Sequence, residues 1–200
     1  MNIWFATNNV HKKNELQAIL ETRLSIPSDC GISSNPEETG ITFCENALLK
    51  ARELKKLLAN KEEPVIADDS GLCVDALNGR PGVFSARYGE TDGEKLTYKQ
   101  KNLLLLEELG DNPLRSARFV CAMVILLDHD RFFIVQETLE GEIVKSRELI
   151  RGEGGFGYDP VFLIPELGRT LAELSAEEKN SLSHRGKAGK AAEVILNKYL

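Results

Sequence analysis

Short apolar runs alternate with amphipathic stretches along this chain, a pattern that predicts strands alternating with helices. Residues 3–6 form an apolar strand, a polar segment follows, and apolar positions between residues 16 and 20 then have helical spacing. Thr42 and Glu45 have the spacing of a capping box, which predicts the start of a second helix. Its apolar positions recur at helical spacing as far as Leu58.

Two adjacent acids follow the next apolar run. Residues 65–67 predict a short strand that ends at Asp68 and Asp69, and we expect residues 70–71 to turn the chain before another brief strand at 72–74. Neighbouring side chains on a strand point to opposite faces, so one acid can face the open side of a sheet and hold a hard cation. The other acid then supports the loop, although a simple capped turn explains the same residues.

The second half of the chain continues the alternation. Thr91 and Glu94 form another capping-box pattern, which opens a helix that Gly110 can end. Residues 119–127 are continuously apolar, so we expect a central strand covered on both faces. The turn after it is so short that the next strand, at 131–135, must be antiparallel.

Two more strands are expected at residues 137–144 and 161–164, and a last helix has its apolar positions between residues 188 and 199. Because the strands at 119–127 and 131–135 must be antiparallel, we expect the sheet to be mixed. We predict an α/β fold with a mixed central sheet flanked by helices, as one domain over residues 1–200.

Charge, hydropathy and cysteine spacing argue against several classes of protein. The chain has 200 residues and a formal charge of −6, which gives no extended basic surface for nucleic acid. We find no leader sequence and no membrane-spanning stretch, so we expect a soluble cytoplasmic protein. The four cysteines are scattered without a Cys-x-x-Cys pair, which argues against structural zinc.

Two polar segments could hold an anion and a metal. Thr7, Asn8, Asn9 and Lys12 lie where a helix begins, a position that suits phosphate oxygens, although a polar turn with a helix cap is the plainer explanation. The acidic segment 37–40 precedes the second helix, and one glutamate from it with one aspartate would suffice for magnesium; a solvated acidic loop is the alternative.

Residues 152–157 match the dinucleotide fingerprint G-x-G-x-x-G, but Pro160 and an apolar strand follow where the fingerprint needs a helix. A nucleobase pocket fits better, with Phe156 stacking on a flat ligand and Asp159 bonding its edge. A glycine-rich surface loop remains the alternative.

A basic cluster lies near the start of the last helix, where Ser183 can serve as the N-cap. His184 and Arg185 are mildly unfavourable at a helix N-terminus unless an acceptor is present, which favours an anionic or carbonyl-bearing ligand over a solvated basic turn. Lys179 belongs to the same cluster.

Six ordered segments together resemble the inosine triphosphate pyrophosphatase family, and they cover nearly the whole chain: Thr7-Asn8-Asn9-Val10-His11-Lys12, residues 37–47, Ala67-Asp68-Asp69-Ser70-Gly71-Leu72, residues 81–88, Gly155-Phe156-Gly157-Tyr158-Asp159-Pro160 and Ser183-His184-Arg185. Many members of that family have glycine where this chain has Asn8.

The resemblance implies an enzyme that cleaves ITP, dITP and XTP between the α and β phosphates with Mg²⁺, releasing a nucleoside monophosphate and pyrophosphate. It implies that Asp69 is the general base and a metal ligand, and that Glu37, with Glu38 as a close competitor, is the second metal carboxylate. The implied substrate contacts are Thr7, Asn8, Asn9, Val10, His11, Lys12, Ser70, Phe156, Gly157, Tyr158, Asp159, Lys179, His184 and Arg185.

The family's architecture implies an elongated mixed sheet in two lobes, an active-site cleft between them, and a homodimer. Three rivals are a related pyrophosphatase for modified pyrimidine nucleotides, a haloacid-dehalogenase-type phosphatase, and a non-catalytic nucleotide sensor. The phosphatase needs Asp-x-Asp on one strand face, whereas Asp68 and Asp69 are adjacent.

Overall fold

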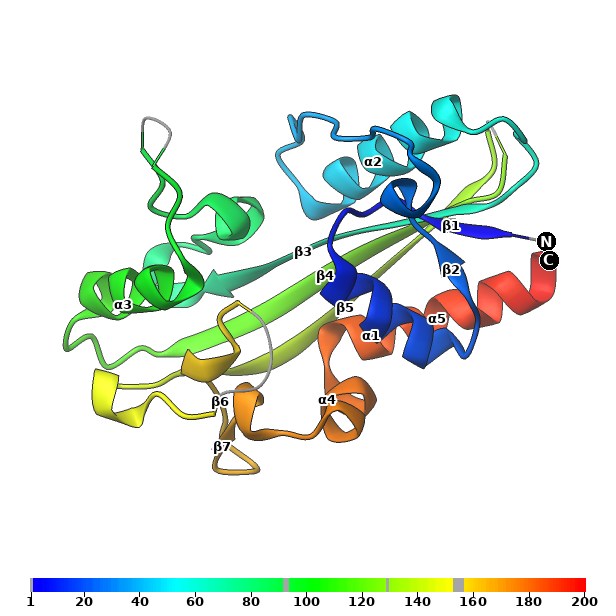
Figure 1. The fold of residues 1–200 in the computed structure, drawn as a ribbon. Helices are drawn as coiled ribbons and strands as arrows, with labels where there is room; N and C mark the ends of the chain where they lie inside the picture. Colours follow the sequence, from blue (N-terminus) through cyan, green and yellow to red (C-terminus); the bar gives the residue numbers. More distant parts are fainter. Residues whose placement is uncertain (1, 92–93, 129, 153–156) are drawn as a thin grey trace. The chain divides into compact units, whose positions relative to one another are not determined.

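The computed structural model describes residues 2–91, 94–128, 130–152 and 157–200 (Figure 1). Its single sheet has the strand order β2-β1-β3-β4-β5-β6-β7. The strands are β1 (Ile3–Phe5), β2 (Leu24–Ser25), β3 (Val65–Val74), β4 (Ser116–Leu126), β5 (Phe132–Ile143), β6 (Phe162–Ile164) and β7 (Arg169–Thr170). Since β1 runs parallel to β2 and β3, while β6 runs antiparallel to β5 and β7, the predicted mixed α/β sheet is confirmed.

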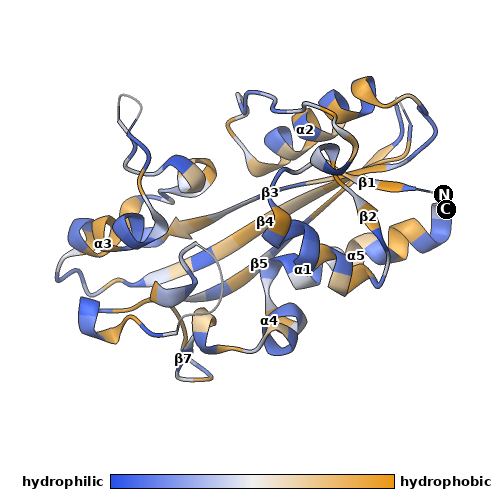
Figure 2. Cartoon of the chain, in the orientation of Figure 1, coloured by the Kyte–Doolittle hydropathy of each residue, from blue (hydrophilic) through white to orange (hydrophobic). Residues whose placement is uncertain are grey.

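Five α-helices accompany the sheet in the described part of the chain: α1 (Val10–Leu20), α2 (Phe43–Leu57), α3 (Tyr98–Leu109), α4 (Ala176–Leu182) and α5 (His184–Tyr199). Figure 2 shows hydrophobic and hydrophilic residues side by side on α2 and α5, as expected of helices with one buried face. None of the helices in these ranges has the length and apolar character needed to cross a membrane.

The chain forms two compact units. The first unit contains residues 1–70, 121–137 and 183–200, and the second contains residues 71–120 and 138–182. Three strands, β3, β4 and β5, contribute residues to both units.

Strand alternation builds two cores in the first unit. Ile66 of β3 belongs to a buried cluster with Leu16 of α1 and Ala188 of α5, whereas its neighbour Val65 belongs to a second cluster with Leu54 of α2. Helices therefore bury both faces of this part of the sheet, as the continuous apolar run in β4 required.

The expected turn at residues 70–71 is wrong. β3 continues from Val65 to Val74 without interruption, and Asp68 and Asp69 are both buried within it. Aspartate, serine and glycine favour turns when water solvates them. Here the protein itself supplies partners for both carboxylates, so the strand continues. Likewise, the two strands expected at 131–135 and 137–144 are one strand, β5.

The predicted start of the third helix is also wrong. Thr91 and Glu94 form an isolated antiparallel bridge, and α3 begins later in the chain, where Thr97 and Gln100 make the capping box. Both pairs fit the same sequence pattern, so the pattern alone could not choose between them. The other helix ends are confirmed: Thr42 and Glu45 cap α2, and Gly110 ends α3.

The contact between α1 and α5 predicts a sensitive position. A Cβ atom added at Gly189 would lie 2.7 Å from Ile19 Cγ2 and 3.3 Å from Leu16 Cδ1. We expect Gly189→Val to lower the free energy of unfolding by about 1–3 kcal/mol, because overpacking forces buried side chains apart. Urea unfolding measures this, with Lys190→Val at the next, exposed position as the control. Equal stability of the two variants would contradict the close packing.

Candidate active site

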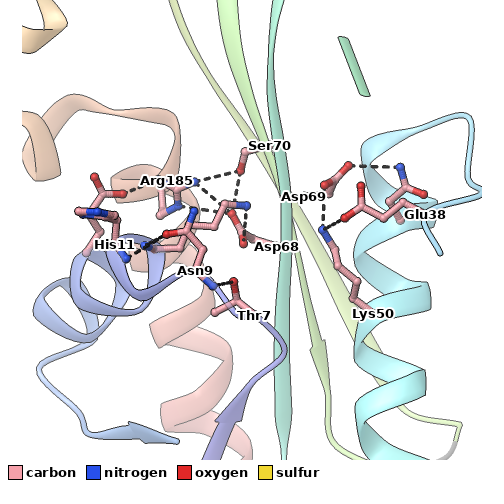
Figure 3. A network of polar contacts seen from close by, with 12 residues as sticks. Thr7, Asn9, His11, Glu38, Lys50, Asp68, Asp69, Ser70 and Arg185 are labelled. Atoms are coloured by element: carbon pink, nitrogen blue, oxygen red, sulfur yellow. Dashed lines mark hydrogen bonds and ion pairs between the residues drawn. The ribbon is translucent and has the colours of Figure 1, made fainter. Parts of the chain in front are cut away.

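Strand β3 directs its two adjacent aspartates to opposite faces of the sheet. In Figure 3, Asp68 lies with Ser70 and Arg185 on one side of the strand, and Asp69 lies with Lys50 and Glu38 on the other. The two carboxylates therefore belong to two separate polar networks. Both networks lie within the first unit.

The network of Asp68 is internally balanced. Lys12 Nζ lies 3.0 Å from Asp68 Oδ1, Arg185 Nη2 lies 3.2 Å from Asp68 Oδ2, and Ser70 donates a 2.8 Å hydrogen bond to the same oxygen. Arg185 also pairs with Glu15 of α1. Burial raises the pKa of Asp68, but Lys12 and Arg185 outweigh it and hold that pKa well below the ordinary range. Two carboxylates and two cations make a stable, neutral group.

The network of Asp69 has more negative than positive charge. Lys50 Nζ lies 2.8 Å from Asp69 Oδ1 and 3.2 Å from Glu38 Oε1, so one ammonium serves two carboxylates. Asn46 Nδ2 completes the group with a 3.4 Å hydrogen bond to Asp69. Burial raises the pKa of Asp69 in spite of Lys50, and the charge of Glu38 adds to the rise. The three neighbouring carboxylates Asp69, Asp68 and Glu38 in turn outweigh burial and raise the pKa of Lys50.

This face suits a hard cation without forming a complete cage. No group of three or more His, Cys, Asp or Glu residues suited to a metal occurs in the described ranges. Magnesium usually needs only one or two carboxylates, because water and substrate phosphate supply its other ligands. Glu38 is half-buried beside Lys50, whereas Glu37 is exposed.

The segment before α1 forms a capped helix start. Asn9 Oδ1 accepts hydrogen bonds of 2.9 Å from His11 N and 3.2 Å from Lys12 N, and Thr7 Oγ1 accepts one of 3.1 Å from Asn9 N. Asn8 reaches away and donates to Ser34 O at 2.8 Å. Asn8, Val10 and His11 are exposed. The plainer explanation of these residues, a polar turn with a helix cap, is therefore present in the structure. The exposed residues Asn8, Val10 and His11 are accessible to an anion.

The second unit contains four of the predicted substrate contacts that the structure describes: Gly157, Tyr158, Asp159 and Lys179. Asp159 and Lys179 form an ion pair at 2.8 Å and are only 2% and 8% exposed. Tyr158 is buried and donates a 2.9 Å hydrogen bond to Ser85 O. Gly157 has a φ of +76°, a backbone conformation that favours glycine. Phe156, the predicted stacking ring, lies outside the described residues.

His184 and Arg185 begin α5 in the first unit, and both are buried. Ser183 Oγ accepts a 3.1 Å hydrogen bond from Gly186 N, which confirms Ser183 as the N-cap. The acceptors that Arg185 needs at a helix N-terminus come from the protein, since Asp68 and Glu15 both bind its guanidinium.

Comparison with known proteins shows the family of this chain. The family model described as the Ham1 family matches residues 3–194. This chain belongs to the Ham1 family. A "dITP/XTP pyrophosphatase" of Treponema denticola is 51% identical over 189 residues, which span 94% of each chain. One of Geobacillus kaustophilus with the same name is 47% identical over 191 residues, 93% of this chain and 89% of that protein.

The fold is likewise that of solved Ham1 structures. The structure of a HAM1 protein from Coxiella burnetii superposes with a TM-score of 0.87 and 38% sequence identity, and the match covers 99% of both chains.

Sequence reasoning missed three residues of this Ham1 site: Glu15, Asn46 and Lys50. The last two were detectable in principle. They lie one turn apart on α2, and so on one side of the helix, and they are polar residues beside the buried positions Ala47 and Ala51. Polar side chains next to an apolar stripe indicate a buried polar partner, which here is Asp69. Glu15 gave no comparable signal.

The two aspartates of this Ham1 protein should respond differently to neutralisation. Asp68→Asn leaves Lys12 and Arg185 without their shared counter-charge, and we expect a loss of about 3–5 kcal/mol in the free energy of unfolding. Asp69→Asn removes one of two buried carboxylates that share a single lysine. The free energy of unfolding should therefore fall by less than in Asp68→Asn, with a difference of at least about 2 kcal/mol. Urea unfolding near neutral pH with chelator tests the difference, and equal losses would contradict the unequal charge balance.

Proposed function

We propose that this chain hydrolyses the non-canonical purine triphosphates ITP, dITP and XTP to the nucleoside monophosphate and pyrophosphate. The observation that carries the proposal is the undercompensated pair Asp69 and Glu38, held by one lysine on an otherwise buried sheet face. Phosphoanhydride cleavage requires positioning and charge neutralisation rather than a covalent nucleophile, and this group could hold the cation that neutralises the phosphate charge. The names of the relatives from Treponema denticola and Geobacillus kaustophilus support the substrate class.

Magnesium fits this site by its chemistry. Asp69 and Glu38 present hard oxygen ligands, and both lie beside the ammonium of Lys50. We assign the second carboxylate to Glu38, because it shares Lys50 with Asp69, whereas Glu37, which the family resemblance favours, is exposed. A bound magnesium would neutralise phosphate charge and acidify a water molecule.

The chain's own residues would then divide the work. Asp69 would orient the attacking water and accept its proton, as a positioned carboxylate can. Lys50 neutralises charge beside it. Thr7 to Lys12 would bind the phosphate chain at the start of α1, where the helix dipole favours an anion. Ser70, whose hydroxyl donates a hydrogen bond to Asp68, is another predicted substrate contact in the first unit.

In the second unit, base recognition would use Phe156 for stacking and Gly157, Tyr158, Asp159 and Lys179 as further contacts. The predicted contact from the first unit is His184. Hypoxanthine and xanthine carry a 6-keto acceptor where adenine carries an amino donor, so a donor from His184 would favour the former. A site built on one specific hydrogen bond can discriminate by about 10⁴. Arg185 acts by holding Asp68, because Asp68 and Glu15 already bind it. The homodimer, the cytoplasmic location and the absence of nucleic-acid or membrane partners stay predictions.

A product assay tests the reaction. With ITP and Mg²⁺ we expect IMP and pyrophosphate, and Asp69→Asn should lower kcat by about 10²–10⁴ while inosine nucleotide binding stays measurable. Formation of IDP and orthophosphate would mean that a different bond is cleaved. Full activity of Asp69→Asn would refute the role of Asp69, and binding of ITP without turnover would make the chain a nucleotide sensor.

Adjacent glutamates provide a matched pair for the metal assignment. Glu38→Gln should raise the Mg²⁺ concentration needed for half-maximal activity by about tenfold, since it removes one of two carboxylate ligands. Glu37→Gln, at the neighbouring exposed position, should leave that concentration nearly unchanged. Titration of activity with Mg²⁺ at saturating ITP measures both variants. The reverse order would return the assignment to Glu37.

A further inference from the structure

Helix α3 supports the base-recognition residues of the second unit through several contacts. Asn102 Nδ2 donates a 3.2 Å hydrogen bond to Gly157 O. One turn earlier on the same side of α3, Tyr98 packs edge-to-face on Tyr158, with ring centroids 5.9 Å apart and planes at 83°. The backbone from Gly157 to Tyr158 is therefore held directly by two α3 side chains.

The segment that contains Ser85 and Ala86 links Tyr158 to β3 and to α3. Tyr158 OH donates to Ser85 O at 2.9 Å, and Ser85 Oγ in turn accepts a 2.9 Å hydrogen bond from Leu72 N of β3. Lys101 of α3 binds the same loop, through Ala86 O and through Glu90 Oε1 at 2.7 Å. α3, the loop that contains Ser85 and the segment Gly157–Asp159 thus form a closed ring of contacts.

Asn102 carries a cost that a purely structural residue would avoid. It is 5% exposed, and its Oδ1 has no hydrogen-bond partner in the described part of the protein. Leaving a buried acceptor unpaired is unfavourable, and an apolar side chain of the same size at this position would remove that penalty. What the asparagine provides in return, and an apolar side chain cannot, is the hydrogen bond to Gly157 O.

Gly157 is a sensitive point for such a bond. Its φ of +76° places the backbone in a left-handed conformation, and a Cβ there would lie 3.4 Å from Tyr98 Cε1. Shortly after it in the chain comes Asp159, which is 2% exposed and paired with Lys179. Because the segment is short and packed, a shift of the Gly157 carbonyl moves Asp159 as well.

We propose that Asn102 is a positioning residue for purine recognition: its amide fixes the Gly157 carbonyl and thereby the place of Asp159 at the base edge. The inference rests on the proposed function, and it adds a residue of α3 that touches neither phosphate nor metal. It implies that losing Asn102 impairs binding of the base more than cleavage of the phosphoanhydride bond.

The test is Asn102→Leu in the full chain with Mg²⁺. We expect KM for ITP to rise by about tenfold with a much smaller change in kcat, because small displacements of a positioned contact are costly to binding. The ratio of kcat/KM between ITP and GTP should move toward one. The melting temperature should change little, because losing the unpaired Oδ1 offsets losing the donor to Gly157 O.

A control from the same helix separates positioning from stability. Leu105 is fully buried in the core of the second unit, so Leu105→Ala should lower the melting temperature while leaving the ITP to GTP ratio unchanged. If Leu105→Ala shifts the ratio as Asn102→Leu does, or if Asn102→Leu leaves the ratio unchanged, the inference is wrong.

Binding of IMP, measured by calorimetry without turnover, distinguishes this inference from the proposed function. If the wild-type chain cleaves no ITP, the proposed function fails. Weaker IMP binding by Asn102→Leu than by Leu105→Ala would still support the positioning role. Equal IMP affinity of the two variants would overturn that role even in an active enzyme.

Discussion

Side-chain alternation along β3 is the constraint around which the first unit is arranged. Asp68 and Asp69 are adjacent and buried, so they must occupy opposite faces of the sheet, and each needs partners on its own side. α1 and α5 supply Lys12 and Arg185 on one face, and α2 supplies Lys50 on the other. Three helices far apart in sequence are thus tied to one strand by its carboxylates.

The two faces of the sheet differ in how far the charge of the aspartate is balanced by its partners. This difference suggests a structural role for Asp68 and a chemical role for Asp69. The Asp68 face is neutral, since Glu15 balances the second cation, and a neutral buried network adds rigidity without attracting a ligand. On the Asp69 face one ammonium serves two carboxylates, which leaves affinity for another cation. Perturbed carboxylates of this kind are typical of functional sites, because a fully compensated acid has little left to bind.

The sequence predicted which helices and strands occur better than it predicted where a strand continues without a break. Helix α2, the central strand β4 and the mixed sheet followed from periodicity and from the Thr42–Glu45 cap. The continuity of β3 did not, because the partners of Asp68 lie 56 and 117 positions away along the chain, beyond the reach of any local sequence pattern. For the same reason the sequence found Asp69 but not Lys50, whose role depends on the α2 face that β3 meets.

Preorganisation explains why so many polar groups of the site are satisfied without a ligand. Asp68 with Arg185 in the first unit, and Asp159 with Lys179 in the second, are complete ion pairs, so the ordering of these side chains occurs on folding rather than on binding. A group that is left incomplete has more to gain from a ligand or from its neighbours. In the first unit Asp69 and Glu38 share the ammonium of Lys50, and in the second the amide oxygen of Asn102 has no hydrogen-bond partner among the described residues. We propose that the shared ammonium leaves Asp69 and Glu38 able to bind a cation, and that the bond from Asn102 to Gly157 holds a segment that contacts the base.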